Sequence, residues 1–182
     1  MPVCNLIVLS GAPGAGKSTT LAEIERLGFA CVPEVAREII REQVNAGGKA
    51  LPWGDREAYT ELMLRRSVES YLEHAKASGP IFFDRGIPDT LGYARLIGMQ
   101  NDGPIRDACL QYRYAPTVFV APAWQEIYQT DSERKQDFAE AEKTFTVICE
   151  TYRDCGYEVV VLPKASPSER AKFILRELAL AS

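Results

Sequence analysis

The stretch VLSGAPGAGKST, residues 8–19, joins an apolar run to a helix-like segment. Residues 11–18 within it fit the pattern GxxxxGK[ST] without a mismatch. Glycines at these positions let the backbone curl so that successive N–H groups point inward, toward the oxygens of a phosphate. The helix that follows adds the positive end of its dipole. The stretch therefore predicts a binding site for a nucleoside triphosphate.

Two side chains of this glycine loop add chemistry that a simple turn lacks. Lys17 can reach the β- and γ-phosphates, and the Ser18 hydroxyl can ligate Mg²⁺. A glycine-rich turn that only caps a helix is the alternative, but the complete motif between a strand and a helix favours the phosphate site. The residues expected to hold a nucleoside triphosphate and Mg²⁺ are Gly11, Ala12, Pro13, Gly14, Ala15, Gly16, Lys17, Ser18 and Thr19.

Five short apolar runs, rich in Val, Ile and Phe, predict strands that are buried on both faces of a sheet. Helix-like segments separate them, and this alternation indicates an α/β fold with a parallel sheet between two layers of helices. The expected strands are Val3–Ser10, Phe29–Pro33, Pro80–Asp84, Thr117–Ala121 and Tyr157–Leu162. The expected helices are Lys17–Leu27, Glu34–Asn45, Asp55–Ala77, Ile87–Ile97, Ile105–Tyr112, Arg134–Asp154 and Ser168–Leu180.

Composition limits the class of protein. A chain of 182 residues is expected to form a single domain, residues 1–182. The net charge of -4 argues against a general electrostatic grip on nucleic acid. No apolar run is long enough to span a bilayer and no signal peptide is recognisable, so we expect a cytoplasmic protein. Five cysteines without CxxC spacing predict free thiols rather than a disulfide framework or a zinc site.

Ligands of a parallel sheet bind beyond the carboxyl ends of its strands, so the residues that follow each strand are candidates for chemistry. In IFFDRGIPD, residues 81–89, an apolar strand ends in Asp84, which is placed to hold Mg²⁺ through its water shell. Arg85 follows directly and is placed to clamp a phosphate or the acceptor substrate. The alternative is that Asp84 caps the next helix and pairs with Arg85.

The stretch VPEVARE, residues 32–38, follows the second strand. Glu34 is placed to accept the proton of an acceptor hydroxyl or to orient that hydroxyl, and Arg37 is placed to hold an acidic or phosphorylated acceptor. A solvated helix with Glu–Arg pairs is the alternative. Trp53 lies between the second and third strands, where either an acceptor pocket or ordinary packing would account for it.

A polar stretch after the fourth strand, about residues 123–137, predicts a lid that closes over the phosphates. Arg134 within it is expected to stabilise the charge that develops during phosphoryl transfer. The alternative is a charged loop in which Asp131 or Ser132 caps the next helix.

These stretches together resemble the small P-loop kinases of the nucleoside and nucleotide kinase group. GAPGAGKST, VPEVAREII, FFDRGIPDTLGYARL and the lid stretch TDSERKQDF are more closely similar to the AAA_28 family, and through it to the kinase domain of the NadR proteins (nicotinamide riboside kinase). The resemblance implies a five-stranded parallel sheet in the order 2-3-1-4-5 that binds ATP–Mg²⁺. In deoxynucleoside kinases a Glu after the second strand is the presumed base and a D/E-R pair follows the third, places that Glu34, Asp84 and Arg85 match.

The leading functional hypothesis is an ATP-dependent phosphotransferase that acts on a small hydroxylated or phosphorylated metabolite, such as a nucleoside or nucleotide. Its catalytic residues would be Lys17, Glu34, Asp84, Arg85 and Arg134. A second hypothesis is a regulatory module that hydrolyses the nucleotide slowly and signals through loop movement. A third is a kinase that phosphorylates nucleic-acid ends or inactivates a toxin or antibiotic. An oligomer is compatible with each.

Overall fold

The structure of the chain is a computed structural model that describes residues 5–127 and 137–180. Its centre is a sheet of five parallel strands in the order β2-β3-β1-β4-β5, which confirms the order that the family resemblance implied. The register sets Leu9 beside Asp84 and Gly11 beside Ala121. The strands are β1 (Leu6–Gly11), β2 (Ala30–Val32), β3 (Ile81–Asp84), β4 (Thr117–Ala121) and β5 (Glu158–Val161).

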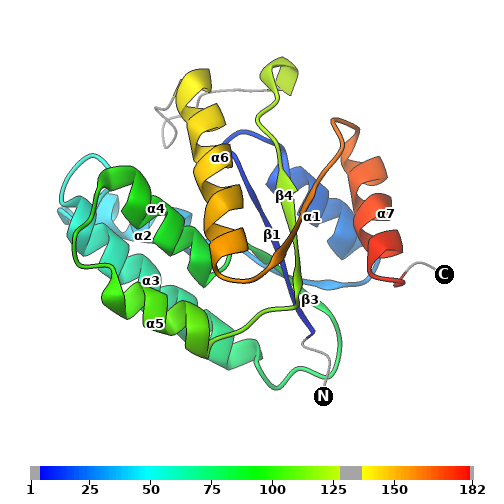
Figure 1. Cartoon of the computed structure of the whole chain (residues 1–182), viewed down its shortest axis with the longest axis horizontal. Coiled ribbons are helices and arrows are strands. Elements are labelled where there is room, and N and C mark those ends of the chain that lie inside the picture. The colour runs from blue at the N-terminus through cyan, green and yellow to red at the C-terminus, as the bar shows by residue number, and fades with distance from the viewer. Residues whose placement is uncertain (1–4, 128–136, 181–182) are drawn as a thin grey trace.

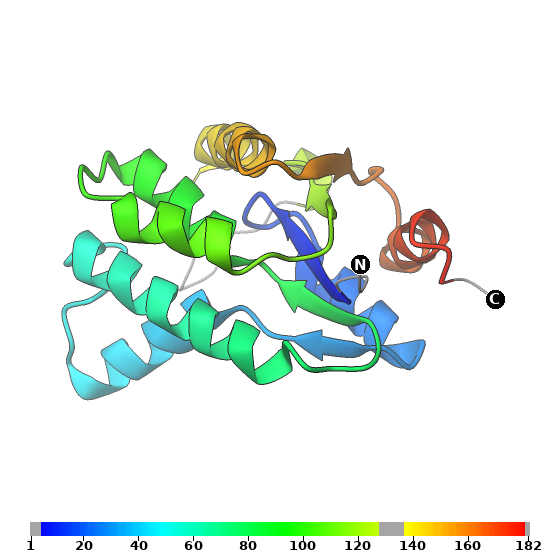
Figure 2. The same ribbon diagram turned by 60° about the horizontal axis from the view of Figure 1, so that its bottom comes forward.

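Helices cover both faces of the sheet. α1 and α7 lie on one face of the sheet, α3, α4, α5 and α6 lie on the other, and α2 packs against α3 (Figures 1 and 2). Within the described residues the helices are α1 (Lys17–Arg26), α2 (Val35–Ala46), α3 (Arg56–His74), α4 (Ile87–Ile97), α5 (Gly103–Gln111), α6 (Phe138–Asp154) and α7 (Pro167–Glu177), with a short 3-10 helix η1 (Gln125–Ile127).

The central strands bury both of their faces, because consecutive side chains point to opposite sides of the sheet. In β1, Leu6 and Val8 join the core beneath α4, α5 and α6, whereas Ile7 and Leu9 join the core beneath α1 and α7. The prediction of burial on both faces is correct for β1, β3 and β4 and wrong for β2 and β5. These two are edge strands, and Val161 in β5 is 44% exposed.

Local signals set where several elements begin. Ser166 caps α7, as its position before the helix allows, and its hydroxyl accepts a hydrogen bond from the Glu169 N–H. Asp137 caps α6 in the same way, accepting from the Glu140 N–H at 2.8 Å, so neither Asp131 nor Ser132 is the cap of this helix. The four cysteines that lie within the described ranges are free thiols, as predicted. Across residues 5–127 and 137–180, no helix has the length and apolarity to cross a membrane.

Candidate active site

The glycine loop lies at the carboxyl end of β1, in the middle of the sheet. Gly11 has a φ of 134°, and a β-carbon there would stand 2.2 Å from the carbonyl oxygen of Ala121 in β4, so no side chain fits. Gly16 caps α1 in the left-handed region at φ 79°. The Thr20 hydroxyl donates to the Gly16 carbonyl at 3.0 Å and so fixes the first turn of the helix. The backbone is thereby held in a curl at the strand end.

Lys17 is the cation of the loop and is only 6% exposed. Its Nζ donates to the Ala12 carbonyl oxygen at 3.0 Å rather than to a carboxylate. Burial, helped by the positive charge of Arg85, lowers the pKa of Lys17 to about 8, although Asp84 and Glu34 act in the opposite direction. Among the described residues, no carboxylate is hydrogen-bonded to this buried cation, an arrangement that suits an anionic phosphate.

Arg85 connects the ends of three elements. Its φ of 73° lies in the left-handed region, which costs a non-glycine residue energy and is a mark of functional sites. Its backbone N–H donates to the Leu9 carbonyl in β1 at 3.0 Å. Its Nε donates to Glu34 at 2.7 Å, and its Nη1 donates to Asp89 at 2.9 Å and to the Gly11 carbonyl at 3.2 Å. The guanidinium therefore lies between the glycine loop and Glu34.

Glu34 is fixed from two sides, because its second carboxylate oxygen accepts a bond from Arg37 Nε at 3.2 Å. Burial opposes ionisation of this carboxyl, but the charges of Arg85 and Lys17 outweigh it and lower the pKa of Glu34 to about 2. The Glu–Arg pairing that the sequence left open as an alternative therefore does form. It makes Glu34 a weak base with fixed oxygens, suited to orient a hydroxyl.

Asp84 ends β3 with a buried carboxyl group whose Oδ1 has no hydrogen-bond partner among the described residues. Burial raises the pKa of Asp84 to about 6. Gly86, not Asp84, caps α4, so the alternative reading of Asp84 as a helix cap is wrong. A buried carboxylate oxygen without a partner fits a cation with its water shell, and Ser18 at the start of α1 offers a hydroxyl of the kind Mg²⁺ accepts.

Asp89 is a site residue that the sequence analysis missed. Its carboxylate accepts four hydrogen bonds, from Ser10 Oγ at 2.5 Å, the Gly86 N–H at 2.9 Å, Arg85 Nη1 and Tyr152 Oη at 2.6 Å. The available signal was an acidic residue three positions after a glycine at the start of an otherwise apolar helix, the spacing of an N-terminal cap. Asp89 fixes the position of Arg85 from within the core.

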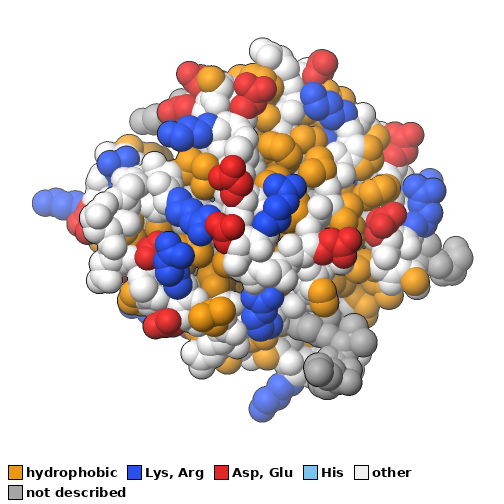
Figure 3. Space-filling view, in the orientation of Figure 1, with side chains coloured by type: hydrophobic (Ala, Val, Ile, Leu, Met, Phe, Trp, Pro, Cys, Tyr) orange, Lys and Arg blue, Asp and Glu red, His pale blue; other side chains and the backbone are white. Residues whose placement is uncertain are grey.

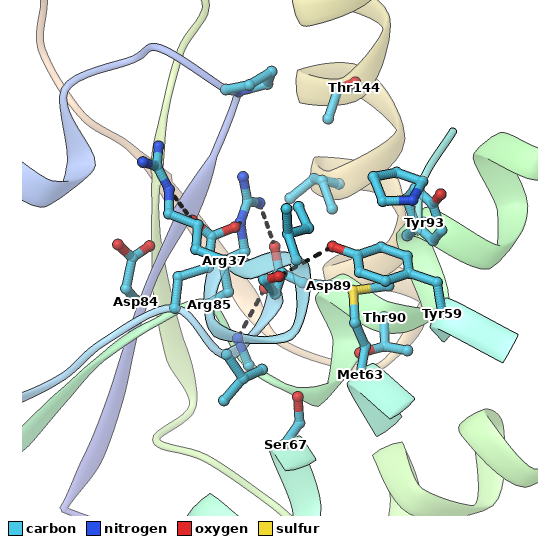
Figure 4. A pocket seen from close by; sticks show the side chains of 18 of the residues that line it. Arg37, Tyr59, Met63, Ser67, Asp84, Arg85, Asp89, Thr90, Tyr93 and Thr144 are labelled. Atoms are coloured by element: carbon cyan, nitrogen blue, oxygen red, sulfur yellow. Dashed lines mark hydrogen bonds and ion pairs between the residues drawn. The ribbon is translucent and has the colours of Figure 1, made fainter. Parts of the chain in front are cut away.

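A cavity of about 540 Å³ opens beside these groups. Figure 4 shows Asp84, Arg85 and Arg37 on one side of it and Tyr59 and Tyr93 on the other. The rings of Tyr59 and Tyr93 meet edge to face, with centroids 5.5 Å apart. Nothing in the helical pattern of the sequence marked these two tyrosines. Further lining residues are Pro13, Lys17, Glu34, Trp53, Arg56, Met63 and Thr144.

The family model of AAA_28, an AAA domain, matches residues 6–170. The chain belongs to the AAA_28 family. A comparison with curated proteins found no match.

Solved structures share the fold of this AAA_28 chain. They include NadR protein in complex with NR (TM-score 0.78, 17% identity, covering 99% of this chain and 53% of that one). Deoxyadenosine kinase from M. mycoides with the products dCMP and dCDP has a TM-score of 0.65 and 18% identity, with 96% and 98% covered. Thymidylate kinase from Ehrlichia chaffeensis has a TM-score of 0.63 and 15% identity, with 98% and 100% covered. The AAA_28 chain spans about half the length of the NadR chain, and at these identities the likeness shows the P-loop kinase fold.

Two predictions for this AAA_28 protein concern Trp53 and the lid. Trp53 is 46% exposed and lines the cavity, so it lies at the cavity mouth. Of its two interpretations, an acceptor pocket and ordinary packing, this position is compatible with the first. Arg134 and most of the lid stretch lie outside the described residues, so the lid stays a prediction. The part of that stretch that is described consists of residues 123–127, which include η1, and Asp137.

Charged side chains on the surface of the AAA_28 protein are mixed in sign. On the face drawn in Figure 3, Lys and Arg side chains are interspersed with Asp and Glu. Exposed pairs include Arg66 with Glu42 at 2.6 Å and Arg106 with Asp102 at 2.7 Å. This face gives no support to an electrostatic grip on nucleic acid.

Proposed function

We propose that the chain, as a single catalytic domain, transfers the γ-phosphoryl group of ATP to a hydroxyl group of a small acceptor. One observation carries the proposal: a single cavity is lined both by Pro13 and Lys17 of the P-loop and by Glu34. A hydroxyl held at Glu34 would therefore face the end of a triphosphate held by the loop. Positioning of this kind supplies most of the catalysis in phosphoryl transfer.

The chain's own groups divide the work. Lys17 and Arg85 place positive charge where the transferring phosphoryl group becomes more negative. Ser18 and Asp84 would hold Mg²⁺, which when bound neutralises charge on the phosphates. Glu34 accepts a hydrogen bond from the acceptor hydroxyl and orients it. Because the pKa of Glu34 is about 2, it performs this role as a carboxylate at neutral pH and carries no proton that it could donate.

The cavity walls favour an acceptor that carries a planar ring. Tyr59, Tyr93 and Trp53 supply aromatic surface, and Arg37 and Arg56 supply positive charge to the same cavity. A nucleoside or nucleotide combines a ring, hydroxyl groups and, in the second case, a phosphate. The names of the structural neighbours, a deoxyadenosine kinase and a thymidylate kinase among them, support the same class.

The decisive experiment follows the label of γ-labelled ATP in the presence of nucleosides, nucleotides, sugars or oligonucleotides, each added alone. The proposal predicts that the label moves to a nucleoside or nucleotide and stays on ATP when no acceptor is present. Release of labelled phosphate at the same rate with and without every acceptor would instead favour the regulatory ATPase.

A variant that fills the cavity sharpens this result. Ala36 lines the cavity at the start of α2 and is half-buried, so Ala36→Trp adds bulk without opening the core. The expected outcome is loss of transfer with unchanged ATP binding. Transfer at the wild-type rate in this variant would place the acceptor elsewhere.

A further inference from the structure

Arg170 is the most buried charged side chain of the described residues, at 1% exposure, although it lies in the first turn of α7. Its Nη1 donates to the Ala15 carbonyl of the P-loop at 2.6 Å, and its Nε donates to the Pro163 carbonyl at 2.8 Å. Its guanidinium also lies over the ring of Trp124, 5.1 Å from the centroid. It therefore joins the P-loop to the segments that follow β4 and β5.

Packing alone does not explain why an arginine occupies this position. No carboxylate of the described residues pairs with it, and its buried Nη2 has no partner among them. The first turn of a helix is also the positive end of the helix dipole, where a cation is disfavoured. Burial lowers the pKa of the Arg170 guanidinium, which reflects the cost of removing an unpaired charge from water.

The contact with Ala15 controls the direction of a backbone donor. A trans peptide is planar, so its C=O and N–H point to opposite sides. Because Arg170 holds the Ala15 oxygen toward α7, the Gly16 N–H must point away from α7. Arg170 also packs directly on this peptide, since its Nη1 lies 3.4 Å from where a Gly16 β-carbon would stand. The Gly16 N–H belongs to the group of loop donors that face phosphate oxygens in this motif.

We propose that Arg170 is a positioning residue for the nucleotide: it locks the Ala15–Gly16 peptide so that the Gly16 N–H faces the phosphates. Its charge, which no carboxylate of the described residues pairs with, also adds to the positive potential of the P-loop. This inference rests on the proposed function only in requiring that the P-loop binds nucleotide phosphates.

Arg113 provides a matched control at the other end of the sheet. Like Arg170, it donates to two backbone carbonyls, here both from Nη1, to Cys109 at 3.3 Å and to Cys155 at 2.8 Å. Its guanidinium also lies over an aromatic ring, 4.0 Å from the centroid of Tyr157. Replacing either arginine by Met removes similar contacts, but only Arg170→Met touches the P-loop.

The experiment measures the Kd of ATP–Mg²⁺ by calorimetry for the full chain and its variants, at a temperature where circular dichroism shows each to be folded. Arg170→Met should weaken binding about tenfold or more, because one donor to a charged phosphate is misdirected. Arg170→Lys keeps the charge but not both carbonyl bonds, and should fall between. Arg113→Met should stay within about twofold of the wild type.

Two outcomes would overturn the proposal: wild-type affinity in folded Arg170→Met, or equal weakening in Arg113→Met. If Arg170→Met does not fold, Arg170→Lys decides, with the amide NMR signal of Gly16 as a second readout. The signal should shift in Arg170→Lys and not in Arg113→Lys, and an unmoved signal with wild-type affinity would refute the idea. Absence of ATP binding by the wild type would instead refute the proposed function itself.

Discussion

On the acceptor side of the P-loop, Arg85 and Arg37 hydrogen-bond to the carboxylate of Glu34, and Arg85 also to that of Asp89. On the nucleotide side, Lys17 and Arg170 donate to backbone carbonyls instead, within the described residues. Within the described residues, positive charge is therefore paired with carboxylates around Glu34 and is not paired with them at Lys17 and Arg170. Under the function proposed above, the first arrangement suits the orientation of a hydroxyl and the second suits the binding of a polyanion.

Loss of the positive charge of Lys17 should have the largest effect. Lys17→Ala is expected to lower turnover by roughly 10³-fold, because Lys17 would stabilise the negative charge that grows on the transferring phosphoryl group in the transition state. The measurement is the rate of label transfer from γ-labelled ATP, with exposed Lys76 replaced by Ala as the control. Turnover that survives in Lys17→Ala would remove this lysine from the mechanism.

Loss of the fixed carboxylate should act on transfer and not on nucleotide binding. Glu34→Gln is expected to cut the rate by roughly 10²-fold while the Kd of ATP–Mg²⁺ hardly changes. Glu38→Gln, on the exposed face of the same helix, is the control. A comparable loss of ATP affinity in Glu34→Gln would contradict the division between the two sides.

The loss of rate caused by Glu34→Gln should not depend on pH in the assay range. A pKa lowered to about 2 means that Glu34 takes up a proton only near that pH, far below the assay range. The ratio of wild-type to Glu34→Gln rates should therefore be constant between about pH 5 and pH 8. A ratio that falls toward one at the acid end would show that the carboxyl becomes protonated in this range, which would contradict the lowered pKa.

Removing the buried carboxylate of Asp89 should lower the stability of the fold. Asp89→Asn leaves Arg85 buried with one carboxylate fewer, and we expect a loss of about 2–4 kcal/mol in the free energy of unfolding. Asp154→Asn breaks an exposed pair with Arg95, at 2.8 Å, and should cost under about 1 kcal/mol. Urea unfolding of both variants compares them, and equal losses would mean that Asp89 does not hold Arg85 in place.

The smallest effect is expected at the rim. Trp53→Ala should raise the KM of the acceptor by roughly two- to tenfold without changing the Kd of ATP–Mg²⁺, because one aromatic contact is lost. Leu72, an exposed apolar residue of α3 outside the cavity lining, serves as the Ala control. An unchanged KM would favour the packing interpretation of Trp53.

The sequence was informative where chemistry follows a strand. Glu34, Asp84 and Arg85 were predicted together because the carboxyl ends of parallel strands meet at one edge, and the structure does bring them together beside Lys17. The P-loop was predictable for the same reason, since its function is carried by consecutive residues of the backbone. The partial exposure of the edge strands could not be predicted, because runs of Val and Ile look alike in sequence whether a strand is central or at the edge of the sheet.

Residues on helix faces were harder to find. Tyr59 and Tyr93 repeat at positions that ordinary packing also fills, so their place in a cavity wall depends on how α3 meets α4. Asp89 and Arg170 each bond to partners far away in sequence: Ser10 and Tyr152 lie 79 and 63 residues from Asp89, and the carbonyl that Arg170 binds lies 155 residues before it. A charged residue of this kind reads as one more solvated position of a helix until the tertiary structure shows what it touches.

We propose that positive charge at the P-loop, which no described carboxylate neutralises by a hydrogen bond, makes this site prefer nucleotides with more phosphates. Titration of the full chain with ATP–Mg²⁺, ADP–Mg²⁺ and adenosine in a calorimeter tests it most directly. We expect measurable binding of ATP and ADP, with affinity falling as phosphates are removed and with adenosine the weakest. Equal affinity for adenosine and ATP, or no heat from either, would contradict the account.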